Sequence, residues 1–182
     1  MTAASTKPGA VLAFWREAGP SRWFRKDASF DREFHDRFLA AHEAAARGEF
    51  DAWAAMPDGA LALCILLDQF PRNAFRGTPR MFATDAKARA VARGAIDSGF
   101  GDAVDEPLRQ FFVLPLMHSE ELEDQEQCVE LARGLESDTH RYAVMHRDII
   151  HRFGRFPHRN AVLGRESTPE EVKFLAEGGF AG

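Results

Sequence analysis

Apolar residues recur along this chain at intervals of three and four positions, which is the spacing of an amphipathic α-helix. Phe34, Phe38 and Ala41 show this spacing, and the apolar–polar alternation that is typical of half-buried strands is absent. Gly and Pro interrupt the periodic segments and mark their ends. The pattern predicts helices over residues 9–18, 31–47, 49–55, 59–70, 85–98, 105–117, 120–135, 137–153 and 168–177.

Several predicted boundaries carry recognisable start and stop residues. Pro71 is expected to close the apolar helix 59–70, and Pro115 to kink or end the helix 105–117. The string Thr168-Pro169-Glu170-Glu171 is a capping box with Pro at the first helical position. Three further N-caps are expected at Asp58, Thr84 and Ser119. We therefore expect an all-α fold of about eight or nine helices in antiparallel pairs.

The composition fits one globular domain that spans residues 1–182, because 45% of the residues are hydrophobic, 28% are charged and no linker divides the chain. Cys64 and Cys128 are isolated within apolar runs, which favours a reducing compartment. The chain shows neither a secretory pattern nor a membrane-spanning run, so we expect a cytoplasmic protein without a membrane partner. The net charge of −5 argues against nucleic acid as a partner.

Asp68 and Gln69 end the run Leu61–Leu67, which is apolar on every face and should be buried. A buried carboxylate needs a partner, because an unpaired buried charge is costly. The candidate partners are Arg72, Arg76, Arg155 and Arg159. Such a pair is either a structural brace or part of a polar pocket in which one Arg stays free for an anionic ligand.

Two similar strings occur in the chain, Gln69-Phe-Pro-Arg-Asn-Ala74 and Arg155-Phe-Pro-His-Arg-Asn-Ala161. They are either two ordinary helix-exit loops, built with Pro and Asn for turn geometry, or two related loops that converge on one site.

Charge is segregated in the second half of the chain. Residues 119–138 hold eight acids and one base, whereas residues 141–165 hold six Arg and one acid. The segregation is typical of two consecutive antiparallel helices with complementary faces. The alternative is a basic pocket for a phosphate or a carboxylate at residues 154–160.

Three of the seven histidines are candidates for chemistry. His118 follows a predicted helix, His146 lies on a core-facing helix face, and His158 belongs to the second Phe-Pro string. With Glu120, Glu121 or Asp124 they would form an acid–base or metal cluster, although none of their spacings is diagnostic. Phosphate-binding, dinucleotide-binding, zinc-protease, Cys-x-x-Cys and serine-nucleophile motifs are all absent, so the cofactor stays unknown.

Four groups of residues resemble an uncharacterised bacterial family, domain of unknown function 924, over about residues 11–175. They are Leu66–Asn73, Phe75–Thr78, Met117–Glu120 with Asp124-Gln125, and Arg152–Asn160 with Leu163-Gly-Arg165. The resemblance implies a tetratricopeptide-like α-α superhelix, although this chain has no internal repeat of about 34 residues. It brings no established activity. Carried over onto this sequence, the candidate site comprises Asp68, Gln69, Arg72, Asn73, His118, Glu120, Asp124, Gln125, His146, Arg155, His158, Arg159 and Asn160.

Three functions are compatible with these residues, so whether the protein is an enzyme stays open. In the first, the arginines hold a small anionic ligand, and His118 or His158 acts as an acid–base group with Glu120 or Asp124 setting its pKa. In the second, a helical scaffold binds a peptide or protein partner on its concave surface, with Trp15, Trp23 and Phe24 as possible anchors. In the third, the histidines and carboxylates bind a catalytic metal ion. The sequence does not determine the oligomeric state.

Overall fold

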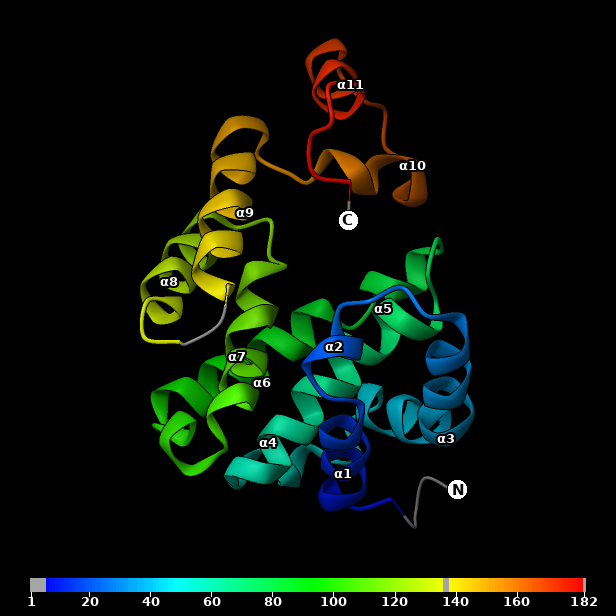
Figure 1. The fold of residues 1–182 in the computed structure, drawn as a ribbon, viewed down its shortest axis with the longest axis vertical. Helices are drawn as coiled ribbons and strands as arrows, with labels where there is room; N and C mark the ends of the chain where they lie inside the picture. Colours follow the sequence, from blue (N-terminus) through cyan, green and yellow to red (C-terminus); the bar gives the residue numbers. More distant parts are fainter. Residues whose placement is uncertain (1–5, 136–137, 182) are drawn as a thin grey trace.

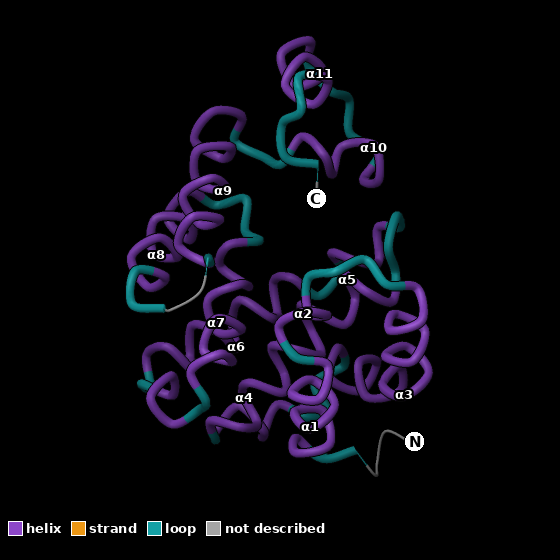
Figure 2. The backbone as a smooth tube through the Cα atoms, viewed as in Figure 1, coloured by secondary structure: helices purple, strands orange, loops and turns teal. Residues whose placement is uncertain are grey.

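The computed structural model describes residues 6–135 and 138–181. Every regular element in these ranges is helical (Figure 2), as the periodicity predicts. The α-helices are α1 (Pro8–Ala18), α2 (Pro20–Trp23), α3 (Ala28–Ala46), α4 (Pro57–Cys64), α5 (Phe70–Ala74), α6 (Asp85–Asp97), α7 (Glu106–Met117), α8 (Leu122–Ala132), α9 (Thr139–Phe153), α10 (Asn160–Leu163) and α11 (Pro169–Ala176). A π-helical turn covers Ile65–Gln69, and 3-10 turns cover Asp51–Ala55, Pro79–Phe82, Phe100–Ala103 and Pro157–Arg159.

From α6 to α9, helices that follow one another in the chain pack against one another. In the first half, α4 packs against both α1 and α6, and α3 packs against α5. Beyond the end of α9 the chain turns, and α10 and α11 lie across from α5 (Figure 1). This arrangement is compatible with a superhelix of helix pairs. Within the described residues, no helix is both long enough and apolar enough to cross a membrane.

The apolar side chains form two separate cores. The large core contains helices α1 to α8 and includes a stack of aromatic rings around Trp15 and Phe34. Trp15 and Trp23 are both buried in it, which leaves Phe24, 62% exposed, as the accessible member of the three possible anchors. The small core surrounds Ile149, Ile150 and Phe156. The C-terminal elements therefore have a core of their own, joined to the rest through α9.

The helical path continues through Pro71, so the expectation that Pro71 closes the helix is wrong. Pro71 lies in the first turn of α5, and the Phe70 N–H bonds to the Ile65 carbonyl five residues back, which widens the chain into a π-turn. The Leu66 carbonyl accepts a bond from His42 Nδ1 at 2.8 Å instead, and the Leu67 carbonyl accepts one from Thr84 Oγ1 at 2.6 Å. Side chains from α3 and from the start of α6 thus replace the missing helix bonds.

Other boundaries differ less from the expected ones. Pro115 lies inside α7, which ends two residues later, and Asp58 lies in the first turn of α4 rather than at its N-cap. The Ser119 hydroxyl accepts a bond from the Glu121 N–H just before α8. The capping box at Thr168 is present with both reciprocal bonds. The segment 19–30, which lies between two predicted helices, contains the short helix α2 and the first residues of α3.

Gly59 yields a test of the packing at the start of α4. A Cβ atom at this position would lie 2.1 Å from the Trp53 carbonyl oxygen, whereas one at Gly94 in α6 would meet nothing within 4 Å. We expect Gly59→Ala to lower the free energy of unfolding by about 1–3 kcal/mol through overpacking. Gly94→Ala should raise it by about 0.5–1 kcal/mol, because Ala is the better helix former. Urea denaturation measures both, and equal effects of the two substitutions would contradict the assigned close approach.

Candidate functional site

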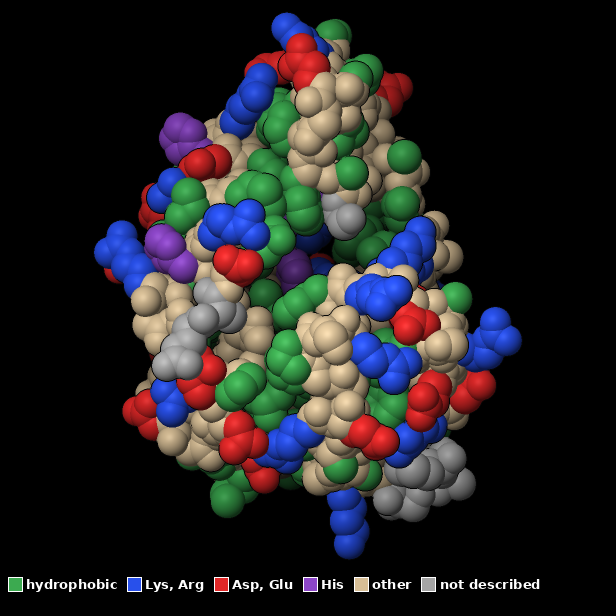
Figure 3. All heavy atoms as spheres, in the orientation of Figure 1, with side chains coloured by type: hydrophobic (Ala, Val, Ile, Leu, Met, Phe, Trp, Pro, Cys, Tyr) green, Lys and Arg blue, Asp and Glu red, His purple; other side chains and the backbone are tan. Residues whose placement is uncertain are grey.

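The face of the molecule in Figure 3 is hollowed between the C-terminal elements and the large core. A His side chain, basic side chains and acidic ones are visible in this hollow, which we call the cleft. Ion pairs and electrostatic contacts connect a group of polar residues at this boundary between the two cores. The buried members are Asp68, Asp85, His146 and Arg159, and the nearly buried ones are Arg72 and His118.

Asp68 and His118 form a hydrogen-bonded pair in the cleft. The π-turn places Asp68, which is 1% exposed, so that its Oδ1 lies 2.8 Å from Nδ1 of His118 at the end of α7. Gln69 Nε2 donates to the other carboxylate oxygen at 2.6 Å. Burial by itself would raise the pKa of Asp68, but the charge of Arg72, together with the hydrogen bonds from His118 and Gln69, outweighs burial and holds this pKa below its usual range. The ionised carboxylate therefore fixes the orientation of the imidazole.

Arg72 joins the carboxylates of Asp68 and Asp85. Its Nη1 and Nη2 donate to the two oxygens of Asp85 at 2.9 and 3.0 Å, in a bidentate fork. Nη1 also lies 3.0 Å from Asp68 Oδ1 and donates to the Asp68 carbonyl at 2.9 Å. This guanidinium makes three hydrogen bonds to protein acceptors, so it fixes the positions of both carboxylates in the cleft.

Arg159 is buried but far less engaged. Its guanidinium lies over the rings of Phe82 and Phe156, at 4.7 and 4.4 Å from their centroids. Nη2 donates to the His118 carbonyl at 2.9 Å, whereas Nη1 is 3.7 Å from Asp85 Oδ2, beyond hydrogen-bond distance. Nε is buried and has no partner among the described residues. Burial and the charge of Arg72 lower the pKa of Arg159 to about 10.

The three candidate histidines lie around this guanidinium and are held neutral. Burial, with the charge of Arg72 next in size, lowers the pKa of His118. Burial and neighbouring charges lower the pKa of His146 to about 3 and that of His158 to about 4. Each of the three therefore offers an uncharged imidazole near neutral pH.

The two Phe-Pro strings converge on the cleft. Phe70 and Phe156 are fully buried, one in each core. Arg72 belongs to the first string and Arg159 to the second. Both side chains face Asp85 and pack against the ring of Phe82. The repeated sequence therefore places two guanidinium groups on the same carboxylate.

The Asn before the final Ala of each Phe-Pro string acts as a brace away from the cleft. Asn73 donates to Asp31 at 2.7 Å, and Asn160 donates to Glu171 at 3.2 Å. Arg155 also binds Glu171, through both carboxylate oxygens. These contacts link neighbouring segments of the chain and bring none of the three side chains to Arg159.

The remaining candidates also hold backbone or helices in place. Glu120 accepts bonds from the Phe156 N–H and from Arg165, both at 2.9 Å, and so ties the second string to the start of α8. Asp124 pairs with Arg89 and Arg93 of α6. Gln125 donates to the Met117 and Ser119 carbonyls at the end of α7. Neither Glu120 nor Asp124 contacts His118; its carboxylate partner is Asp68.

Two residues of the cleft are absent from the sequence-derived candidates. Asp85 begins α6, where an acid is ordinary because it favours a helix N-terminus. Phe82 lies in a short 3-10 turn. Nothing in the local pattern of either residue distinguishes it, and only the tertiary contacts with Arg72 and Arg159 reveal its place.

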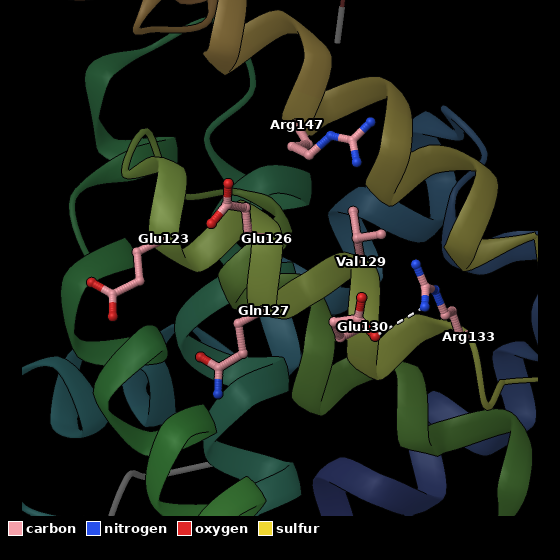
Figure 4. Close-up of a pocket in the computed structure, with 7 residues that line it drawn as sticks. All are labelled: Glu123, Glu126, Gln127, Val129, Glu130, Arg133 and Arg147. Atoms are coloured by element: carbon pink, nitrogen blue, oxygen red, sulfur yellow. Dashed lines mark ion pairs between the residues drawn. The ribbon is translucent and has the colours of Figure 1, made fainter.

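A second concavity lies outside the cleft. Acidic residues of α8 and Arg147 of α9 line an open groove of about 630 Å³ (Figure 4). Glu130 pairs with Arg133 at the end of α8, and Arg147 pairs with Asp148 of α9. Each of these charged side chains thus finds its partner near it in the sequence and not on the other helix. In residues 119–135 and 138–165 we find no ion pair that joins α8 to α9. The described residues also contain no group of three His, Cys, Asp or Glu side chains arranged to hold a metal ion.

Comparisons with known proteins give a family without an assigned activity. The family model described as a bacterial protein of unknown function (DUF924) matches residues 11–179. No curated protein matches the chain. The solved structure of the protein of unknown function ATU0120 from Agrobacterium tumefaciens is similar, with 52% sequence identity and a TM-score of 0.91. The similarity covers 94% of this chain and 97% of that chain.

The contrast between the two arginines can be tested by stability. Arg72→Ala leaves Asp68 and Asp85 buried without their main partner, so we expect a loss of about 3–5 kcal/mol in the free energy of unfolding. Arg159→Met keeps an apolar chain between the rings and leaves Asp85 paired with Arg72. We expect a change within about 1 kcal/mol of the native protein, because the removed cation lacks a full set of partners. Chemical denaturation measures both, and an Arg159→Met loss as large as that of Arg72→Ala would overturn the distinction.

The buried histidines also predict how stability depends on pH. His146 and His158 titrate near 6.5 in an unfolded chain but at about 3 and 4 in the fold. Between these values the unfolded state binds more protons, so stability falls as the pH falls from 6.5 towards 4. Each tenfold difference in proton affinity contributes about 1.4 kcal/mol. Thermal melts from pH 7.5 to 4.5 should show this decline, and His146→Leu should flatten it, whereas the exposed His151→Leu should not. A constant melting temperature over this range would contradict the prediction.

Proposed function

The chain belongs to the DUF924 family of bacterial proteins of unknown function, and we propose that this member binds a small oxyanion in the cleft through Arg159. The observation that carries the proposal is a buried guanidinium with incomplete hydrogen bonding. Nε of Arg159 has no partner among the described residues, and Nη1 has none within hydrogen-bond distance.

The nearest carboxylate does not satisfy this guanidinium. Asp85 gives both of its oxygens to the fork of Arg72, and its contact with Arg159 is 3.7 Å long. An oxyanion at the edge of Arg159 would supply acceptors in the planar arrangement that a guanidinium prefers. It would also offset the repulsion between Arg159 and Arg72, which contributes to the lowered pKa of Arg159.

The aromatic rings restrict how a ligand reaches Arg159. Phe82 and Phe156 both lie against the guanidinium, so a carboxylate or phosphate would approach along its edge. Nη1, which is not sealed from solvent, is the natural point of contact. The buried surroundings strengthen such a charged hydrogen bond relative to one in water.

The alternative function, a scaffold for a peptide or protein partner, has weaker support. Trp15 and Trp23 are part of the large core, and of the three possible anchors only Phe24 is exposed. The incompletely bonded guanidinium of Arg159 lies among other polar side chains in a hollow and not on a broad apolar surface, which favours a small ligand.

A binding screen tests the proposal. We expect inorganic phosphate, sulfate or small carboxylates to raise the melting temperature. A ligand at 100 times its Kd adds about 2.7 kcal/mol, which corresponds to roughly 5–11 °C for a chain of this size. Arg159→Met should abolish the shift while its circular dichroism stays helical. Arg152→Ala, which removes an exposed Arg of α9 paired with Glu170, is the matched control and should bind normally.

Two results would refute the proposal. One is a screen in which no anion stabilises the native protein. The other is an Arg159→Met variant that keeps the native affinity, since binding would then occur elsewhere, for example at the groove of Figure 4.

A further inference from the structure

We infer that the ligand is an oxyanion that also carries a hydroxyl group, and that His118, oriented by Asp68, accepts a hydrogen bond from this hydroxyl. The inference rests on the proposed function, because Arg159 is taken to hold the anionic part. The hydrogen-bonding state of two imidazole rings in the same cluster as Arg159 defines this second half of the ligand.

The tautomer of His118 follows from its partner. Nδ1 lies 2.8 Å from Oδ1 of Asp68, and an ionised carboxylate only accepts hydrogen bonds, so Nδ1 carries the proton. In the neutral ring the lone pair is then on Nε2. This atom has no hydrogen-bond partner among the described residues, and it is not one of the side-chain atoms sealed from solvent. His118 therefore presents an acceptor.

His146 presents a second acceptor for the same reason. Its Nδ1 lies 2.8 Å from the Tyr142 carbonyl, which also only accepts. Nε2 again bears the lone pair, without a partner among the described residues and without being sealed. Burial and the nearby His118 and His158 keep this ring neutral.

Both acceptors belong to the same cluster as Arg159. The guanidinium of Arg159 lies 4.4 Å from the centroid of the Phe156 ring, and the His146 ring meets the same phenyl ring at 5.4 Å. Arg159 also donates to the backbone carbonyl of His118 at 2.9 Å. One cationic donor and the acceptor of His146 thus lie against a single aromatic side chain, and the backbone of His118 is hydrogen-bonded to the same cation.

This set of groups is complementary to a defined ligand chemistry. The cation requires acidic oxygens, and the two imidazole nitrogens require donors such as hydroxyl hydrogens. A plain oxyanion would satisfy Arg159 and leave both nitrogens unpaired. Sites built to bond a substrate hydroxyl discriminate strongly against analogues that lack it, because their polar groups are then left without partners.

The hydroxyl of the ligand donates a hydrogen bond to Nε2 of His118 and keeps its proton, because an alcohol is a far weaker acid than an imidazolium whose pKa is lowered. Asp68 holds the proton of the ring on Nδ1, which leaves the Nε2 lone pair for this bond. The charged or titratable groups that face His118 are Asp68, Arg72, Asp85, His146 and His158, together with Arg159.

Matched pairs of probes test this inference by isothermal titration calorimetry. The pairs are glycolate with acetate, malate with succinate, and glycerol 3-phosphate with propyl phosphate. We expect the hydroxylated member of at least one pair to bind ten or more times tighter to the native protein. The pair that shows the preference distinguishes a carboxylate from a phosphate ligand.

The variant His118→Asn isolates the role of Nε2. The Asn amide can still donate to Asp68, but it lacks the outer nitrogen, so the preference for the hydroxylated probe should fall to about onefold. The exposed His151→Asn is the control and should keep the preference. In the nitrogen-15 spectrum of the native protein, the resonance of the unprotonated His118 Nε2 should shift more when the hydroxylated probe is added than when the matched probe without a hydroxyl is added. A merely structural His118 would not produce this difference.

The outcomes separate the two proposals. Equal binding of both members of every pair, lost in Arg159→Met, would overturn this inference and leave the proposed function intact. Failure of all six probes to bind would overturn both. A preference for the hydroxylated probe that persists in His118→Asn would also overturn the role assigned to His118.

Discussion

Pro71 lacks a backbone N–H, and the rest of the site depends on how the chain accommodates this absence. An α-helix that passes through a proline loses a bond to the carbonyl four residues earlier. Here the Phe70 N–H reaches back to Ile65, and the carbonyls of Leu66 and Leu67 accept hydrogen bonds from side chains. His42 and Thr84 fill these positions. These two bonds connect the buried π-turn Ile65–Gln69 to α3 and to the start of α6. Asp68 is the fourth residue of this turn.

The polar cluster that results is balanced in charge. Asp68 and Asp85 face Arg72 and Arg159, while the three neighbouring histidines are neutral. Removing four charges from water is costly, and apolar residues of similar volume often stabilise a protein as well or better. The incomplete bonding of Arg159 makes this cost still harder to explain by stability alone. A cluster that gives up stability in this way is typical of a functional site.

The helices of this structure could be predicted from the sequence more readily than the contacts between their side chains. The helical period and the capping box at Thr168 depend on neighbouring residues, so they are readable along the chain. Asp68 needs a partner simply because the run before it is buried, and Arg72, one of the four nearby or repeated arginines, provides it. Which Arg meets which carboxylate depends on tertiary packing. For this reason Arg155 lies against Glu171, and Asp85 at the cleft stays unmarked in the sequence.

The repeated Phe-Pro strings explain why the cleft needs both cores. Each string buries its Phe in a different core and extends an Arg to the same carboxylate, so the distance between the two guanidinium groups is set by how the cores are placed. Beyond the packing of α9 against α7 and α8, polar contacts hold this placement, chiefly Glu120 with the Phe156 N–H and Arg159 with the His118 carbonyl. An anion bound by Arg159 beside His118 would contact both sides of this boundary at once. Ligand binding and the docking of the C-terminal elements are then thermodynamically linked, and each strengthens the other by the same free energy.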